Sequence, residues 1–209
     1  VWLHEYLNDF PGKQDVLRYT LIATAPETKD NDFTWRDFQA RNNSELVAIL
    51  GNFVHRTLVL TGNYYGGKVP AKGNYTEVAN TLINFIADTK KQIGESIERY
   101  RLREALALLM DIARAGNKYL ADLEPWKLIK TDADRTATVL HASLQVTGAL
   151  SLLMEPFLPH TGKKLRDMLG IDNRKWDDHQ VGSILSEGHQ LNDAAVSYTH
   201  LRAHETVLD

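Results

Sequence analysis

The sequence predicts an all-α protein whose core is a bundle of helices. Three observations lead to this prediction. Apolar residues recur at helical spacing in four long segments, and clusters of Pro and Gly separate those segments from one another. No alternating strand pattern of comparable length competes with them. Four amphipathic helices joined by short links bury their apolar faces most simply against one another, as a bundle.

The first 35 residues are expected to be largely irregular. Gln14 to Ala25 has the apolar spacing of a short helix that ends near Pro26. A polar loop follows it. Thr34 then stands directly before Trp35 in the position of a helix N-cap, so a helix is expected to begin there.

Four longer helices follow. The apolar residues that define them are Leu46, Ile49, Leu50, Phe53, Thr57 and Leu60; Ala79, Leu82, Ile83, Ile86, Ile93 and Ile97; Leu102, Ala105, Leu106, Leu109 and Ile112; and Val139, Leu140, Leu144, Leu150 and Met154. Asn74 with Glu77 three residues later resembles a capping box at the start of the second helix. Pro125 follows the third helix, Pro156 stops the fourth, and a short amphipathic piece spans Lys163 to Leu169.

Composition narrows the class of protein. The 209 residues are 43% hydrophobic, enough for one large domain or one domain with flanks. The absence of Cys excludes disulfides and thiolate sites and fits a reducing compartment. No run of about 18 apolar residues occurs, so no membrane partner is expected. The chain starts at Val1 without a signal peptide, and we expect it to begin inside a longer protein.

No catalytic or metal-binding motif is found, so the expected catalytic and metal-ligating residues are none. The sequence lacks G-x-S-x-G, P-loop and G-x-G-x-x-G patterns. The histidines are scattered without the spacing of metal ligands outside the last segment; they are His4, His55, His141, His160, His179 and His189, with His200 and His204 near the end. The net charge of −3 argues mildly against general RNA binding. It still allows the chain to recognise a few bases when other domains of a larger protein also bind the RNA.

Two features have the chemistry of base recognition. Asn52 and Arg56 lie four residues apart, and therefore on one helix face. Asparagine offers a paired donor and acceptor, and arginine offers a rigid fork of donors, which together suit exposed base edges. Trp126, after Pro125, offers a face on which an unstacked base can lie. From spacing alone, a solvated surface pair and a tryptophan of the core or of a helix start remain the commoner alternatives.

Several segments resemble bacterial methionyl-tRNA synthetases, a family of class I aminoacyl-tRNA synthetases. They are residues 17–19 (LRY), 25–38 (APETKDNDFTWRDF), 43–47 (NSELV), 50–56 (LGNFVHR), 123–126 (LEPW), 156–159 (PFLP) and 188–190 (GHQ). The resemblance covers essentially residues 1–192 and is specific as a set, although each segment is weak singly. One departure is His55, which stands before the arginine where the family commonly has Asn.

The resemblance implies a cytoplasmic ligase that joins methionine to its tRNA with ATP. In such enzymes a helical anticodon-binding bundle follows the catalytic domain, its K-M-S-K-S loop and a small stem-contact fold. The family's anticodon-binding residues map onto Asn52, Arg56, Pro125 and Trp126. The implied partners are a tRNA with a CAU anticodon and the enzyme's own catalytic domain, and a homodimer of the full enzyme is left open. The catalytic site, with its ATP, methionine and any zinc, would lie outside this chain, so the chain alone should be inactive.

The expected organisation has four parts. Residues 1–38 form the stem-contact region, 39–170 the anticodon-binding bundle and 171–192 a C-terminal extension. Residues 193–209 resemble translated vector or adapter sequence and are expected to be a non-native tail. Two alternatives remain at this point. One is the bundle of a class I synthetase for Ile, Val, Leu or Cys, and the other is a helical protein-interaction module without RNA binding.

Overall fold

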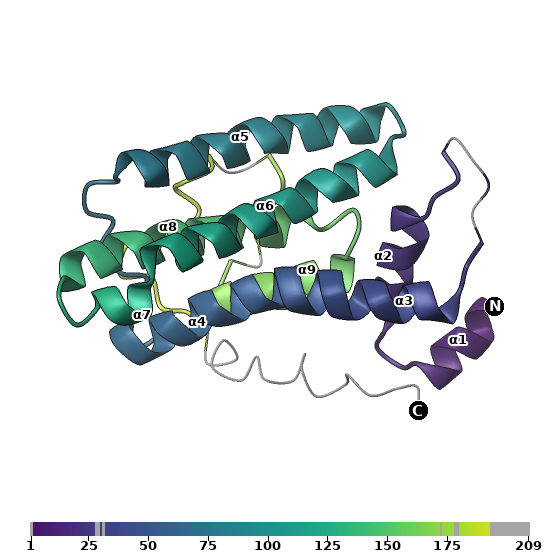
Figure 1. Ribbon diagram of the computed structural model, residues 1–209, viewed down its shortest axis with the longest axis horizontal. Coiled ribbons are helices and arrows are strands. Elements are labelled where there is room, and N and C mark those ends of the chain that lie inside the picture. Colours follow the sequence, from purple (N-terminus) through teal and green to yellow (C-terminus); the bar gives the residue numbers. More distant parts are fainter. Residues whose placement is uncertain (1, 28–29, 31, 172, 178–179, 193–209) are drawn as a thin grey trace.

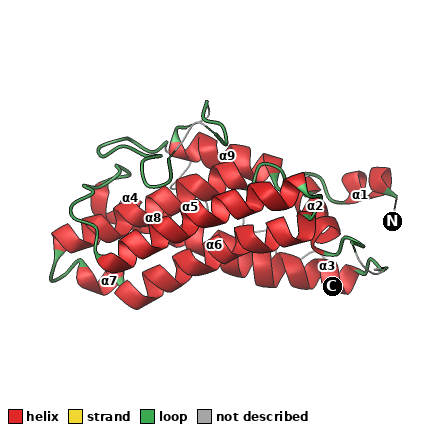
Figure 2. Ribbon diagram, turned by 90° about the horizontal axis from the view of Figure 1, so that it is seen from above, coloured by secondary structure: helices red, strands yellow, loops and turns green. Residues whose placement is uncertain are grey.

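The computed structural model describes residues 2–27, 30, 32–171, 173–177 and 180–192, and the predicted tail at 193–209 lies outside them. Within these residues the regular structure is helical, apart from one isolated bridge between Lys68 and Gln190 (Figure 2). The elements are α1 (Leu3–Asp9), α2 (Gln14–Ala23), α3 (Trp35–Arg41), the π-helix η1 (Asn42–Gly51), α4 (Asn52–Tyr65), α5 (Glu77–Glu98), α6 (Leu102–Leu123), α7 (Pro125–Leu128), α8 (Ala133–Leu153) and α9 (Pro159–Leu169). The predicted all-α bundle is confirmed.

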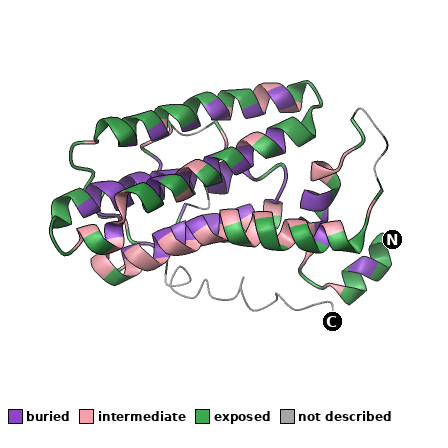
Figure 3. Ribbon diagram, viewed as in Figure 1, coloured by how far each residue is buried: buried purple, intermediate pink, exposed green. Residues whose placement is uncertain are grey.

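Helices α4, α5, α6 and α8 form the bundle, in which α5 packs on α6 and α8 contacts all three others (Figure 1). The predicted fourth stripe is in fact buried on every side, since each residue from Thr136 to Leu153 is buried (Figure 3). This helix is long and apolar enough to cross a membrane by length and composition, yet its apolar window is wholly enclosed by the protein. Burial all round is the property of a bundle's central helix.

One continuous helical rod runs from α3 through η1 into α4. Its start agrees with the prediction, because the Thr34 hydroxyl accepts a hydrogen bond from the Asp37 amide at 3.1 Å. It ends at Gly66, which has a φ of 59° in the left-handed region. The middle section is π-helical, and the amide of Asn52 donates to the carbonyl of Val47, five residues earlier. The predicted boundary between residues 38 and 39 falls inside α3 and stays a prediction.

Two local predictions were wrong. Residues 3–9 were expected to be irregular but form α1, because Tyr6 is buried against Phe10 and Phe38, with ring centroids 5.0 and 6.0 Å away. A helix of seven residues is too short to show a helical period, and the contact with Phe38 comes from a distant part of the chain. Helix α5 is capped by Thr76 and not by Asn74, since the Thr76 hydroxyl accepts from the amide of Ala79 at 3.4 Å.

Candidate nucleic-acid interface

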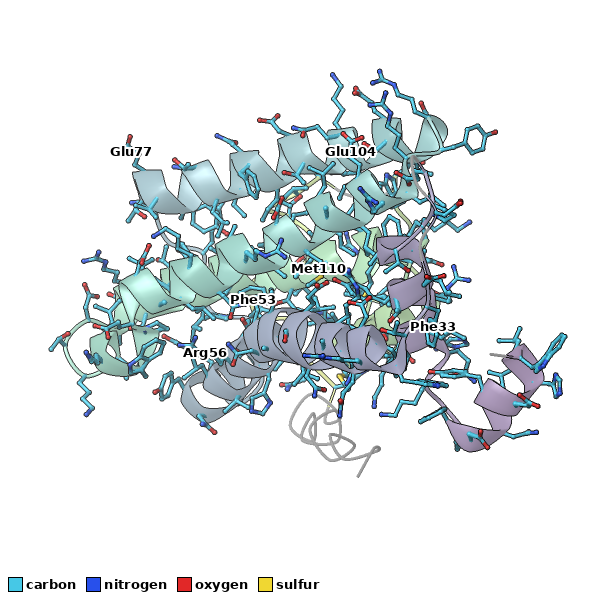
Figure 4. The ribbon with its side chains drawn as sticks, turned by 45° about the vertical axis from the view of Figure 1, so that its right-hand side comes forward. Phe33, Phe53, Arg56, Glu77, Glu104 and Met110 are labelled. Atoms are coloured by element: carbon cyan, nitrogen blue, oxygen red, sulfur yellow. The ribbon has the colours of Figure 1, made fainter. Side chains whose placement is uncertain are left out.

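Arg56 and Trp126, separated by seventy positions, meet on the surface of the bundle. The guanidinium carbon of Arg56 lies 4.7 Å from the centroid of the Trp126 ring. Arg56 comes from the second turn of α4, on the side that faces α7, and Trp126 is the second residue of α7 (Figure 4). Both side chains are half-buried, so each remains partly accessible to solvent. A cation held over an indole at this distance is attracted by the ring's quadrupole.

The turn at Glu124 places Trp126 on this surface. Glu124 has a φ of 43° and a ψ of 57°, a left-handed conformation that costs a non-glycine residue roughly 1–2 kcal/mol. Its amide donates to the carbonyl of Leu120 and so ends α6, while its own carbonyl accepts from Lys127 and Leu128 and so begins α7. Pro125 is buried at the first position of α7. The reversal is therefore complete within one residue, and Trp126 points back towards α4.

Asn52 is held by a side chain of α6. Its Nδ2 donates to the Oδ1 of Asn117 at 3.0 Å. The Nδ2 of Asn117 in turn donates to the carbonyl of Ile49 at 2.8 Å and to that of Ala113 at 3.1 Å. Both asparagines are half-buried, and within the described residues the Oδ1 of Asn52 makes no hydrogen bond. Asn117 thus links the π-helical turn before α4 to α6.

Close packing of α4 on α6 makes this link possible. Gly116 stands next to Asn117, and the ring of Phe53, which follows Asn52, lies against it. A Cβ at position 116 would be only 2.6 to 2.9 Å from three carbons of that ring. The glycine therefore lets the two helices approach until the two amides are within hydrogen-bonding distance.

A cavity of about 580 Å³ opens on the other side of Asn52. Its lining includes Asp15 in α2, Asn52 and His55 in α4, and Lys164 in α9. Asp15 is tied to the start of α9, since its Oδ2 accepts from the amide of Thr161 at 2.6 Å. Asn52 therefore has α6 on one side and open space on the other.

The predicted set Asn52, Arg56 and Trp126 thus lies together around the contact between α4, α6 and α7, and Pro125 is buried at the start of α7. Sequence analysis missed Asn117. The signal was present, because asparagine is unfavourable inside a helix and this one interrupts an apolar stripe of α6. The predicted stripe stops at Ile112, and a partner 65 positions away in the chain cannot be predicted from local spacing.

The side chains on this surface have the chemistry of base recognition. They offer an amide, a guanidinium and an indole face, which are the groups that bind and stack single-stranded bases. Within the described residues no group of three or more His, Asp or Glu side chains could hold a metal ion.

Comparison with known proteins matches both parts of this surface. A family model described as the anticodon binding domain of methionyl tRNA ligase matches residues 69–207, which include Trp126 and extend into the predicted tail. A model for class I tRNA synthetases (M) matches residues 1–58, which include Asn52 and Arg56. The candidate interface is therefore assembled from both matched segments.

Individual relatives agree with the family models. Over 95% of this chain, the sequence is 55% identical to the methionine–tRNA ligase of Phocaeicola vulgatus. Over the whole of this chain, it is 54% identical to the methionine–tRNA ligase of Porphyromonas gingivalis. It spans 29% and 31% of those two proteins. Among solved structures, apo methionyl-tRNA synthetase from Mycobacterium tuberculosis superimposes with a TM-score of 0.80 at 25% identity, covering 85% of this chain and 37% of that one.

Proposed function

The chain belongs to the methionyl-tRNA ligase family, and from that premise we propose that its bundle reads the CAU anticodon of the tRNA that receives methionine. The parent protein would join methionine to this tRNA with ATP, and the bundle would position the tRNA for that reaction. ATP, methionine and any zinc would bind in the part of the parent that this chain does not contain. The division at residue 38 and the homodimer of the parent remain proposals beside this one.

One observation carries the proposal: the Arg56 guanidinium lies over the Trp126 indole while Asn52 is held one helical turn away on α4. In this arrangement Trp126 supplies a stacking surface for one unstacked base, and Arg56 and Asn52 supply donors and an acceptor for base edges. An alternative module that binds only proteins does not require these three groups on one half-exposed surface. The family match also favours methionine over the Ile, Val, Leu and Cys synthetases.

Magnitudes support recognition of a triplet. A good bidentate contact to a base discriminates against the wrong base by about 1–3 kcal/mol, and stacking on an aromatic side chain adds about 1–3 kcal/mol per base. Three such contacts separate cognate from non-cognate loops by several orders of magnitude. The slightly acidic net charge of −3 keeps general affinity for the RNA backbone low, which preserves that ratio.

The test is binding of the 209-residue chain to a stem-loop with a CAU anticodon and to the same loop with a scrambled triplet, at one fixed salt concentration. We expect clear preference for CAU. Trp126→Ala should weaken CAU binding by roughly 5- to 150-fold, the equivalent of one stacked base. The matched control is Trp2→Ala, which removes another indole that is 70% exposed and distant from this surface, and it should leave binding unchanged.

Equal, salt-sensitive binding of both loops that is untouched by Trp126→Ala would refute anticodon reading. The same preparation, supplied with methionine and ATP, should form no methionyl-adenylate. A measurable adenylation rate would contradict the proposal that the catalytic site lies elsewhere in the parent.

A further inference from the structure

We propose that Asn117 is a positioning residue that locks the Asn52 amide in one orientation and thereby makes Asn52 select a base that carries an amino group. This inference rests on the proposed function, and it concerns how the same surface tells one base from another. An asparagine amide has an acceptor oxygen and a donor nitrogen of nearly the same size. If the amide turns over, the two exchange places and the preferred base changes.

The hydrogen bonds of Asn117 determine its own orientation. Two of its contacts are with backbone carbonyls, those of Ile49 at 2.8 Å and Ala113 at 3.1 Å. Carbonyl oxygens only accept, so the atom of Asn117 that faces both must be its nitrogen, whose two hydrogens are then used. The remaining atom, Oδ1, can only accept. It lies 3.0 Å from Asn52, and therefore the atom of Asn52 that it meets must be Nδ2.

The orientation of Asn52 follows from that contact. One of its two N–H groups is engaged by Asn117, which leaves Oδ1 and the second N–H available for a ligand. Turning the amide over would place the oxygens of Asn52 and Asn117 in contact and would lose the hydrogen bond. Since both carbonyls that hold Asn117 belong to helix backbone, the whole chain of contacts is anchored on η1 and α6.

A locked amide of this kind has one complementary type of base edge. Its oxygen accepts from an exocyclic amino group, and its N–H donates to the neighbouring ring nitrogen. Cytosine and adenine present that pair on their pairing edges, whereas uracil and guanine present an oxo group beside a ring N–H. The first two bases of CAU carry amino groups and the third carries an oxo group. Asn52 therefore fits one of the first two positions and rejects its oxo counterpart.

The test uses four stem-loops that differ by one base: CAU, UAU, CGU and CAC. The first two changes replace an amino base by an oxo base, and the third does the reverse. The full chain should discriminate CAU from UAU or from CGU by roughly 5- to 150-fold, the range for one bidentate base contact. Two substitutions of Asn117 that keep its branched shape are compared. Asn117→Leu removes every hydrogen bond, and Asn117→Asp keeps an acceptor for the Asn52 nitrogen but cannot donate to the two carbonyls.

Asn117→Leu should abolish the amino preference at one of the first two positions while the CAU to CAC ratio stays unchanged. Asn117→Asp should retain the amino preference, although it lowers the stability of the fold. A merely structural role for Asn117 predicts a different pattern, in which both variants lose affinity for all four loops by the same factor. That uniform loss would overturn the inference, and so would full discrimination by Asn117→Leu or a loss of the preference in Asn117→Asp.

Failure of this inference is distinguishable from failure of the proposed function. If the unsubstituted chain does not prefer CAU over a scrambled triplet, anticodon reading itself is refuted. If it does prefer CAU, and the Asn117 variants behave in the uniform manner, only the positioning role is refuted.

Discussion

Gly116 is the position at which a single methyl group should separate α6 from α4. An alanine there would put its Cβ at 2.6, 2.7 and 2.9 Å from three carbons of the Phe53 ring, which is fully buried. Carbon atoms pack at about 3.5–4.0 Å, so the ring or the helix must move by close to an ångström. Overpacking of this kind costs about 1–3 kcal/mol. The better helix propensity of alanine offsets up to about 1 kcal/mol of that cost.

Gly94 provides the matched control. It also lies within a helix, α5, but a Cβ there would meet nothing within 4 Å. Gly94→Ala should therefore raise the free energy of unfolding by up to about 1 kcal/mol. Gly116→Ala should be less stable than Gly94→Ala by about 1–3 kcal/mol, which is the overpacking cost alone.

Urea unfolding of the two variants and the parent chain, followed by circular dichroism, measures these differences. Equal stabilisation by both alanines would refute the argument, because it would mean that α4 and α6 are not in close contact at Phe53. We also expect Gly116→Ala to weaken CAU stem-loop binding, since the shift separates Asn117 from Asn52. Gly94→Ala should leave that binding unchanged.

Two further predictions concern pH and helix capping. Burial lowers the pKa of His141 from 6.5 to about 4, with Lys72 adding to the shift and Glu187 opposing it. As the pH falls, His141 therefore binds a proton in the unfolded chain before it does so in the folded one. The free energy of unfolding should drop by at most about 3 kcal/mol between pH 6.5 and 4. Urea denaturation at a series of pH values measures this drop, and His141→Gln should make it smaller. Thr76→Ala should lower the free energy of unfolding by about 0.5–2 kcal/mol, whereas Asn74→Ala should change it by only a few tenths. Thermal unfolding of the two variants measures the difference. The opposite ranking would mean that Asn74 caps α5.

Much of the fold could be predicted from apolar spacing, because each bundle helix is long enough to show its period. Helix α5 begins and ends within a few residues of its predicted stripe, and α6 begins at the first residue of its stripe and ends shortly before Pro125. The prediction fails where the pattern is too short or too uniform. Helix α1 has seven residues and depends on rings from elsewhere in the chain. Helix α8 is buried on every side and so has no polar face to mark its orientation.

For the candidate site, the sequence by itself determined the chemistry. Asn52, Arg56 and Trp126 stand in local patterns that indicate base recognition: a four-residue spacing on a helix, and a Pro-Trp step after one. These patterns lie within a few residues, and local geometry determines which side chains share a face. The same patterns led to the family, because they belong to a specific set of neighbouring segments.

Only the tertiary structure decided how those groups are aimed. The placement of the Arg56 guanidinium over Trp126 depends on the left-handed turn at Glu124. The orientation of the Asn52 amide depends on Asn117 and on the close approach that Gly116 allows. Each is a contact between residues more than sixty positions apart, and such contacts arise from the packing of whole helices, which no local pattern encodes.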